Sequence, residues 1–316
     1  MMNTKNRVSD VNKVFLYTVL VYIGASLLLA RIGRTVVIPT LLSALLSQLL
    51  LVLPSVIYVV RNKISIAQAI RLKKMQVVPV ILTVIFAIFV RPLMNLVNTI
   101  SLLFSENIIQ NTVSDIVVNE NFIVCIIAVA VIPAIFEECV YRGLFYNEYR
   151  KLSVRKGIVL SGFLFGIFHM NLNQFSYAFV LGMVFALVIE ATDSILATMI
   201  IHFITNSYSL LLLKFLPSIL EMTGQTTDYA ATAQSSVLSR EEILSTLPSM
   251  VASTIIPTVL AVFVFYQLAK TSGQWEHIRK IFSFHNDTEL NHQNKLATSY
   301  LVFGMTICIV FIILNL

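Results

Sequence analysis

Long apolar runs separated by short polar segments dominate this chain and restrict what it can fold into. A helix needs about 20 mostly apolar residues to cross the hydrocarbon core of a bilayer, and about nine runs approach or exceed that length. The run at 157–170 is short for a span, and the run at 121–146 is long. The pattern predicts an all-α, polytopic transmembrane bundle of about eight or nine spans, at 14–30, 36–60, 76–100, 121–146, 157–170, 175–192, 194–213, 248–269 and 297–315.

The charge content also favours an integral membrane protein. Hydrophobic residues make up 57% of the chain and charged residues only 12%, whereas about 25% of the residues in an ordinary soluble domain are charged. No soluble domain or Gly/Ser linker interrupts the apolar runs. We therefore expect residues 1–316 to form a single membrane domain embedded in a lipid bilayer.

The net charge of +6 is concentrated in particular loops, so it does not indicate nucleic-acid binding. Residues 61–74 and 150–156 are rich in Lys and Arg, whereas 101–120 contains neither. The positive-inside rule then places four segments in the cytoplasm: the N-terminus, 61–74, 150–156 and 268–296. Arg31 and Arg34 fall in a short outer loop of this topology and argue mildly against it.

The end of the fourth run carries charges that a bilayer-embedded helix normally excludes. Residues 136–145 read FEECVYRGLF, directly after an uncharged stretch. In a helix, Glu138 and Arg142 share a face, as do Glu137 and Tyr141, while the two glutamates point about 100° apart. This geometry predicts that Glu138 pairs with Arg142 and that Glu137 faces a cavity. A charged network at the membrane edge would explain the same residues without any catalysis.

Two further polar intrusions follow on the next runs. His169 is the only ionisable side chain in 161–175, where Gly162 and Gly166 form a small-xxx-small pair suited to close helix packing. His202 and Asn206 lie four residues apart in 194–213 and share a helix face. Each residue alone is more often a packing residue than a catalyst.

The three intrusions are more informative together. Only five histidines occur in the chain, and both that fall in apolar runs follow the glutamate pair. At about 1.5 Å per helical residue, Glu137 and His202 reach the inner half of the bilayer. The same count places His169 nearer the outer side, which implies a tilt, a kink or different helix boundaries.

The ordered motifs Glu137-Glu138-xxx-Arg142, Phe165-xxx-His169 and His202-xxx-Asn206 resemble those of the CPBP family, also called the Abi family. Its members are intramembrane proteases related to the type II CAAX prenyl endopeptidase, together with proteins linked to bacteriocin processing and immunity. The resemblance covers about residues 121–213, the expected catalytic core. It implies a peptide or membrane-protein substrate and, because the family is abundant in bacteria, a bacterial cell membrane.

The resemblance also implies roles for these residues. Glu137 and His169 are expected to activate a water, His202 and Asn206 to form the oxyanion hole, and Glu138 and Arg142 to orient the site or balance its charge. Two histidines and a glutamate could instead hold a divalent metal such as zinc, but the chain has no HExxH helix. The three cysteines, Cys125, Cys139 and Cys308, lie in apolar runs without metal-like spacing. The resemblance to the prenyl-protein endopeptidases favours a glutamate-based mechanism without a ligated metal, and the involvement of a metal is an open question at this point.

Two other classes of function remain open. An ion-coupled transporter could use Glu137, Glu138 and His169 as a relay, but it often contains an internal repeat, and none is visible here. A non-proteolytic immunity or scaffold protein could retain the same fold. The motif residues are all intact, which favours an intramembrane endopeptidase.

Overall fold

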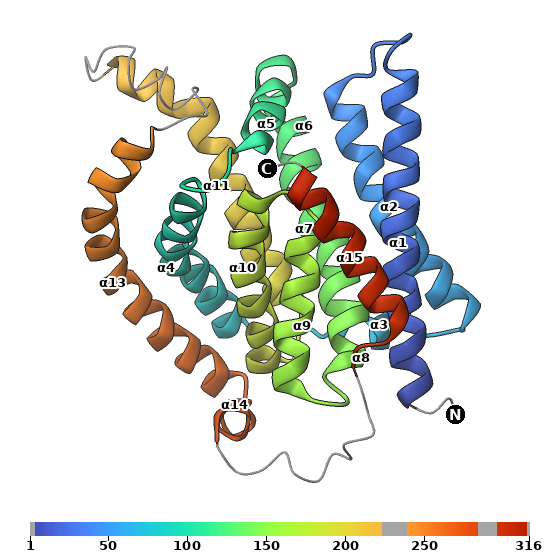
Figure 1. The fold of residues 1–316 in the computed structure, drawn as a ribbon. Helices are drawn as coiled ribbons and strands as arrows, with labels where there is room; N and C mark the ends of the chain where they lie inside the picture. Colours follow the sequence, from blue (N-terminus) through green and yellow to red (C-terminus); the bar gives the residue numbers. More distant parts are fainter. Residues whose placement is uncertain (1–3, 223–238, 284–295, 315–316) are drawn as a thin grey trace.

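The computed structural model describes residues 4–222, 239–283 and 296–314, and every regular element in these ranges is helical (Figure 1). This confirms the predicted all-α bundle. The bounds are α1 (Thr4–Ile32), α2 (Thr40–Arg61), α3 (Ile66–Ala69), α4 (Val77–Ser101), α5 (Ile108–Asn119), α6 (Phe122–Cys125), η1 (Ile126–Val131), α7 (Ile132–Glu138), η2 (Cys139–Tyr146), α8 (Asn147–Tyr149), α9 (Val154–Ile167), α10 (Leu172–Thr192), α11 (Ile195–Met222), α13 (Arg240–Thr271), α14 (Trp275–Phe282) and α15 (Ser299–Leu314).

Seven helical segments of the described chain are long and apolar enough to cross a membrane, so the expected eight or nine spans is an approximate count. Each predicted run does contain a helix. However, α9 has only 14 residues and α15 only 16. At about 1.5 Å per residue, α9 is roughly 21 Å long, which is shorter than the roughly 30 Å hydrocarbon core. Apolar composition alone therefore does not distinguish a span from a short helix packed against the bundle.

The helical segment Phe122–Tyr149 crosses the bundle with two wide turns in it, η1 and η2. Such π-helical turns are rare and often occur at functional sites. Pro133 has no N–H to offer the carbonyl of Val129, four residues earlier. That carbonyl instead accepts a hydrogen bond from Nδ2 of Asn206 at 3.0 Å. An irregularity in one helix thus fixes a polar side chain of α11.

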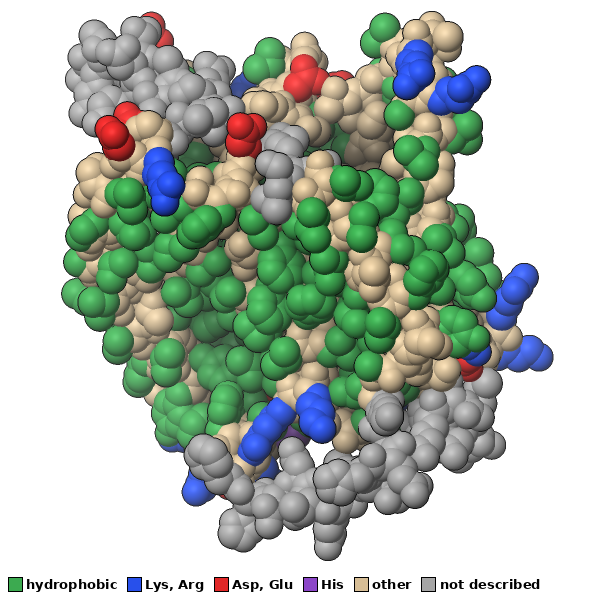
Figure 2. All heavy atoms as spheres, viewed as in Figure 1, with side chains coloured by type: hydrophobic (Ala, Val, Ile, Leu, Met, Phe, Trp, Pro, Cys, Tyr) green, Lys and Arg blue, Asp and Glu red, His purple; other side chains and the backbone are tan. Residues whose placement is uncertain are grey.

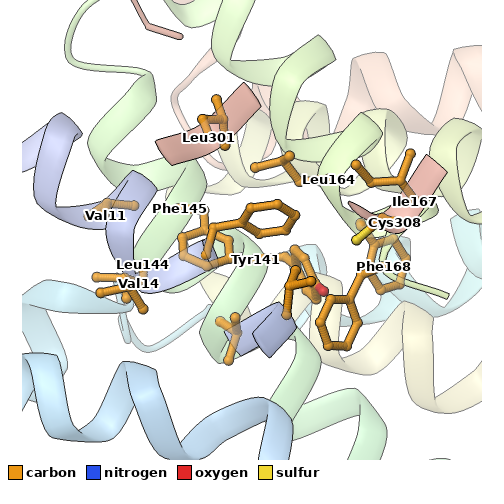
Figure 3. Packing of buried hydrophobic residues seen from close by; sticks show 14 of the residues in the cluster. Val11, Val14, Tyr141, Leu144, Phe145, Leu164, Ile167, Phe168, Leu301 and Cys308 are labelled. Atoms are coloured by element: carbon orange, nitrogen blue, oxygen red, sulfur yellow. The ribbon is translucent and has the colours of Figure 1, made fainter. Parts of the chain in front are cut away.

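An aromatic cluster between α1, η2, α9 and α15 supports the same segment (Figure 3). The Tyr141 ring contacts Phe145, Phe165 and Phe168 edge to face, with ring centres 5.0–6.2 Å apart. Leu301 and Cys308 of α15 are also fully buried in this cluster. The cluster holds the face of the helix that carries Glu137 and Tyr141 in one position.

The molecular surface has the pattern of an integral membrane protein. A broad apolar band crosses the visible face, and most of the Lys, Arg, Asp and Glu side chains on this face lie above and below it (Figure 2). Large apolar side chains within the predicted spans are strongly exposed, including Leu27 at 64% and Val262 at 65%. Because such a surface is unfavourable in water, it is suited to contact with lipid.

Polar contacts join several predicted cytoplasmic segments at one end of the bundle. The buried Glu190, near the end of α10, accepts hydrogen bonds from Arg71 and Arg150 and contacts His277 of α14. Asp193 follows α10 and pairs with Arg71 and Lys73. The segments 61–74 and 150–156 and the helix α14 therefore lie on the same side of the molecule.

Candidate active site

Glu138 and Arg142 form a fully buried ion pair, with 3.2 Å between Oε1 and Nη1. The Arg142 guanidinium also lies over two aromatic rings, 4.2 Å from the centre of Phe165 and 4.8 Å from that of Phe185. Oε1 of Glu138 accepts a second hydrogen bond from Nδ1 of His202 at 3.0 Å. The pair expected from helix spacing is thus present, and it is linked to the histidine of α11.

Glu137 points away from that pair and lines a cavity. Its Oε1 accepts a hydrogen bond from Nε2 of Gln48 at 2.8 Å. Its Oε2 lies 3.8 Å from Nε2 of His202, which is too far for a direct hydrogen bond. The carboxylate is therefore held by one oxygen, and its side chain remains 12% exposed.

His169 lies in the turn between α9 and α10 rather than on a helix. Its Nδ1 is 2.7 Å from the carbonyl oxygen of Phe165. Since a carbonyl can only accept, Nδ1 carries a proton in this contact, and Nε2 is the ring nitrogen left for another partner. The Phe165 ring lies edge to face against both His169 and His202, with centres 5.1 and 6.1 Å apart.

A single cavity of about 510 Å³ brings the four residues with expected catalytic roles together: Glu137, His169, His202 and Asn206. The difference in depth expected from residue counts does not separate them, because the turn that carries His169 follows the end of the short helix α9. Glu138 and Arg142 do not line the cavity and support it from behind. The cavity wall also includes small polar side chains of α2, such as Ser43 and Ser47.

The side chains of metal-binding types around this cavity are Glu137, His169 and His202. Within the described ranges, no group of three or more His, Cys, Asp or Glu side chains is placed to hold a metal ion. Nδ1 of each histidine is engaged, that of His169 with a carbonyl and that of His202 with a carboxylate. Such contacts do not argue against a metal, because metal-binding histidines donate their other ring N–H in the same way. The three cysteines are free thiols.

Sequence reasoning missed Gln48, which directly contacts Glu137. Its only signal was a single amide side chain within an otherwise apolar stretch, LLSQLLLV. An amide in such a position usually finds a polar partner on a neighbouring helix. The sequence alone could not show which helix supplied that partner.

Residues 119–208 match the model of the family described as type II CAAX prenyl endopeptidase Rce1-like. The match includes every residue with an expected role in the site and confirms the family resemblance seen in the motifs. Neither the curated proteins nor the solved structures contain a match to the chain.

Proposed function

We propose that this chain is an intramembrane endopeptidase, because residues 119–208 match the model of the family described as type II CAAX prenyl endopeptidase Rce1-like. Its substrate is a peptide or a membrane-associated protein. The observation that carries the proposal is the shared cavity, because one carboxylate, two imidazoles and three side-chain amides line it inside a largely apolar bundle. Burying polar and ionisable groups in such an environment costs free energy, so their presence usually marks a functional site.

In the proposed reaction, Glu137 is the general base. It takes a proton from a water, the water oxygen bonds to the carbonyl carbon of the scissile peptide, and the C–N bond then breaks. Glu137 returns the proton to the departing nitrogen, so one carboxylate serves both steps. Gln48 orients Glu137, and the acceptor nitrogen of His169 positions the water through its second hydrogen.

His202 and Asn206 stabilise the oxyanion of the tetrahedral intermediate. Asn206 uses one N–H on Val129, which leaves its other amide proton for the oxyanion. For Nε2 of His202 to donate while Nδ1 donates to Glu138, the ring must carry both protons. This imidazolium and Arg142 then balance the charges of Glu137 and Glu138. No step is routed through a metal.

We also propose a cytoplasmic location for the end of the bundle that carries Glu190. The N-terminal end of α1 and the helices α3, α8 and α14 lie toward this end (Figure 1), and the basic segments around Arg71 and Arg150 meet there. The positive-inside rule then places the N-terminus in the cytoplasm. The proposed membrane is that of a bacterial cell.

The proposal is tested with purified protein in nanodiscs and a broad peptide library. The wild type should cleave a subset of peptides with or without a chelator. Asn206→Ala should lower kcat by about 10²–10³, as loss of one oxyanion donor does in a known hydrolase, with little change in KM. If a folded wild type cleaves no peptide, an immunity or scaffold role replaces the protease. If the chelator abolishes cleavage, the metal-free mechanism is wrong.

A further inference from the structure

A second cavity adjoins the catalytic one and has no role in the proposed chemistry. Its volume is about 420 Å³, and it lies between α4, α5 and α11. Tyr177, Thr205 and Asn206 line both cavities. A molecule bound with its carbonyl at Asn206 can therefore extend from one cavity into the other.

This second cavity contains a cation without a carboxylate partner. Arg91 of α4 lines it, and the described residues of its wall include no Asp or Glu. Nη1 of Arg91 is buried and has no hydrogen-bond partner among the residues that the structure describes. The guanidinium lies over the ring of Tyr208 instead, 3.0 Å from its centre.

Three other arginines of this bundle, one fully buried and two partly buried, each have a carboxylate partner. Arg142 pairs with Glu138, while Arg71 and Arg150 pair with Glu190. A guanidinium inside a membrane domain is expensive, and such groups usually mark a ligand path or find a partner. Arg91 instead faces a cavity, whereas each of the other three arginines faces a carboxylate.

The surroundings of Arg91 favour a planar anion. A guanidinium presents parallel N–H groups that match the two oxygens of a carboxylate. The amide side chains of Asn95, Asn98 and Asn107 line the same cavity and can provide further polar contacts. The Tyr208 ring covers the face of the guanidinium, which leaves its edge for in-plane hydrogen bonds.

We propose that Arg91 binds a carboxylate of the peptide substrate, and so selects peptides with a negative charge near the scissile bond. This inference rests on the proposed protease function and names part of its substrate class. The carboxylate belongs either to the C-terminus of the peptide or to an Asp or Glu side chain. The geometry is the same for both sources.

The test compares wild type, Arg91→Gln and Arg91→Lys, with Arg31→Gln at the far end of α1 as the matched control. Three otherwise identical peptides are used: one with a free C-terminus, one with an amidated C-terminus, and one amidated but carrying an internal Asp. Binding is measured separately from cleavage, so the inference can be judged even if no peptide is hydrolysed.

Wild type should bind at least one of the two carboxylate-bearing peptides about 10- to 100-fold more tightly than the neutral, amidated peptide, as expected for hydrogen bonds to a charged group. Arg91→Gln should lose this preference, Arg91→Lys should keep part of it, and Arg31→Gln should match wild type. Which carboxylate-bearing peptide is preferred identifies the source of the charge.

Three results would overturn the inference. One is equal binding of neutral and acidic peptides by wild type. Another is an Arg91→Gln variant that weakens binding of all three peptides equally, because that shows a structural role. The third is a dependence of the Arg91 effect on anionic lipid in the nanodisc rather than on the peptide. If cleavage fails but the binding preference follows Arg91, the protease proposal fails and the carboxylate site stands.

Discussion

At the scale of single residues, Arg142 is the group on which the buried charges depend. It pairs with Glu138 and lies over the rings of Phe165 and Phe185, all within the interior. Glu138 in turn accepts from His202, so one carboxylate holds both the guanidinium and the imidazole. The ion pair therefore orients the proposed oxyanion donor without itself reaching the cavity.

Arg142→Met should destabilise the protein by about 3–5 kcal/mol, since it leaves the Glu138 carboxylate buried with one cation fewer. Thermal unfolding in detergent measures this as a lower Tm, and peptide cleavage should fall with it. The double variant Glu138→Gln, Arg142→Met should recover part of the lost stability but no activity. An Arg142→Met protein as stable as the wild type would contradict this account.

At the scale of elements, the contact between α9 and α10 determines where His169 lies. A Cβ added at Gly162 would come within 2.9 Å of the Met183 backbone nitrogen, and one at Gly182 within 2.7 Å of the Gly162 backbone. The small-xxx-small pattern at Gly162 and Gly166 therefore allows α10, the next helix along the chain, to pack closely against α9. This close approach holds the turn with His169 against the cavity.

Gly162→Val should force α9 and α10 apart, lower Tm by several degrees and reduce cleavage, because His169 would shift with its turn. Gly24→Val in α1 is the matched control, since nothing lies within 4 Å of an added Cβ there. Melting curves and cleavage rates of the two variants would be compared. Equal behaviour of the two would show that the α9–α10 contact is not needed.

The loop between α10 and α11 gives the fold a dependence on pH. Burial raises the pKa of Asp193, but hydrogen bonds from Lys73 and Arg71 outweigh burial, and the net pKa is lowered from its ordinary value of 3.8. A lowered pKa in the folded state means that ionised Asp193 stabilises the fold. This contribution is complete above about pH 4 and is lost as the pH falls through the folded-state pKa.

Asp193→Asn should therefore lower Tm at neutral pH, and the difference from wild type should shrink as the pH falls below about 4. Asn suits the left-handed backbone at this position (φ 53°), so the substitution mainly removes charge. Unfolding temperatures of both proteins between pH 3 and 7 provide the measurement. A difference that stays constant across this range would rule out a contribution from the Asp193 charge.

At the scale of the whole molecule, hydropathy predicted a helix in every apolar run, and the ordered motifs predicted the family. Helix spacing also predicted the Glu138–Arg142 pair, because four residues make about one turn. The tertiary partners could not be predicted in the same way. The contact of Gln48 with Glu137, the hydrogen bond from Asn206 to Val129 and the cavity near Arg91 each join helices far apart in the sequence.

The span count shows the same limit. The short helices α9 and α15 are as apolar as the spans, because buried and lipid-facing positions both require apolar side chains. Composition reports that a residue avoids water, but not whether lipid or protein surrounds it. Only the assembled bundle distinguishes these two environments.

The central claim is that Glu137 activates the water that hydrolyses a peptide bond. The most direct measurement is the cleavage rate of one library-derived peptide by wild type, Glu137→Gln and the control Glu106→Gln, whose side chain is exposed away from the cavity. Glu137→Gln should cleave about 10²–10⁴ times more slowly than wild type with a nearly unchanged Tm, while Glu106→Gln should match wild type. A folded Glu137→Gln protein that cleaves within a few-fold of wild type would contradict the account.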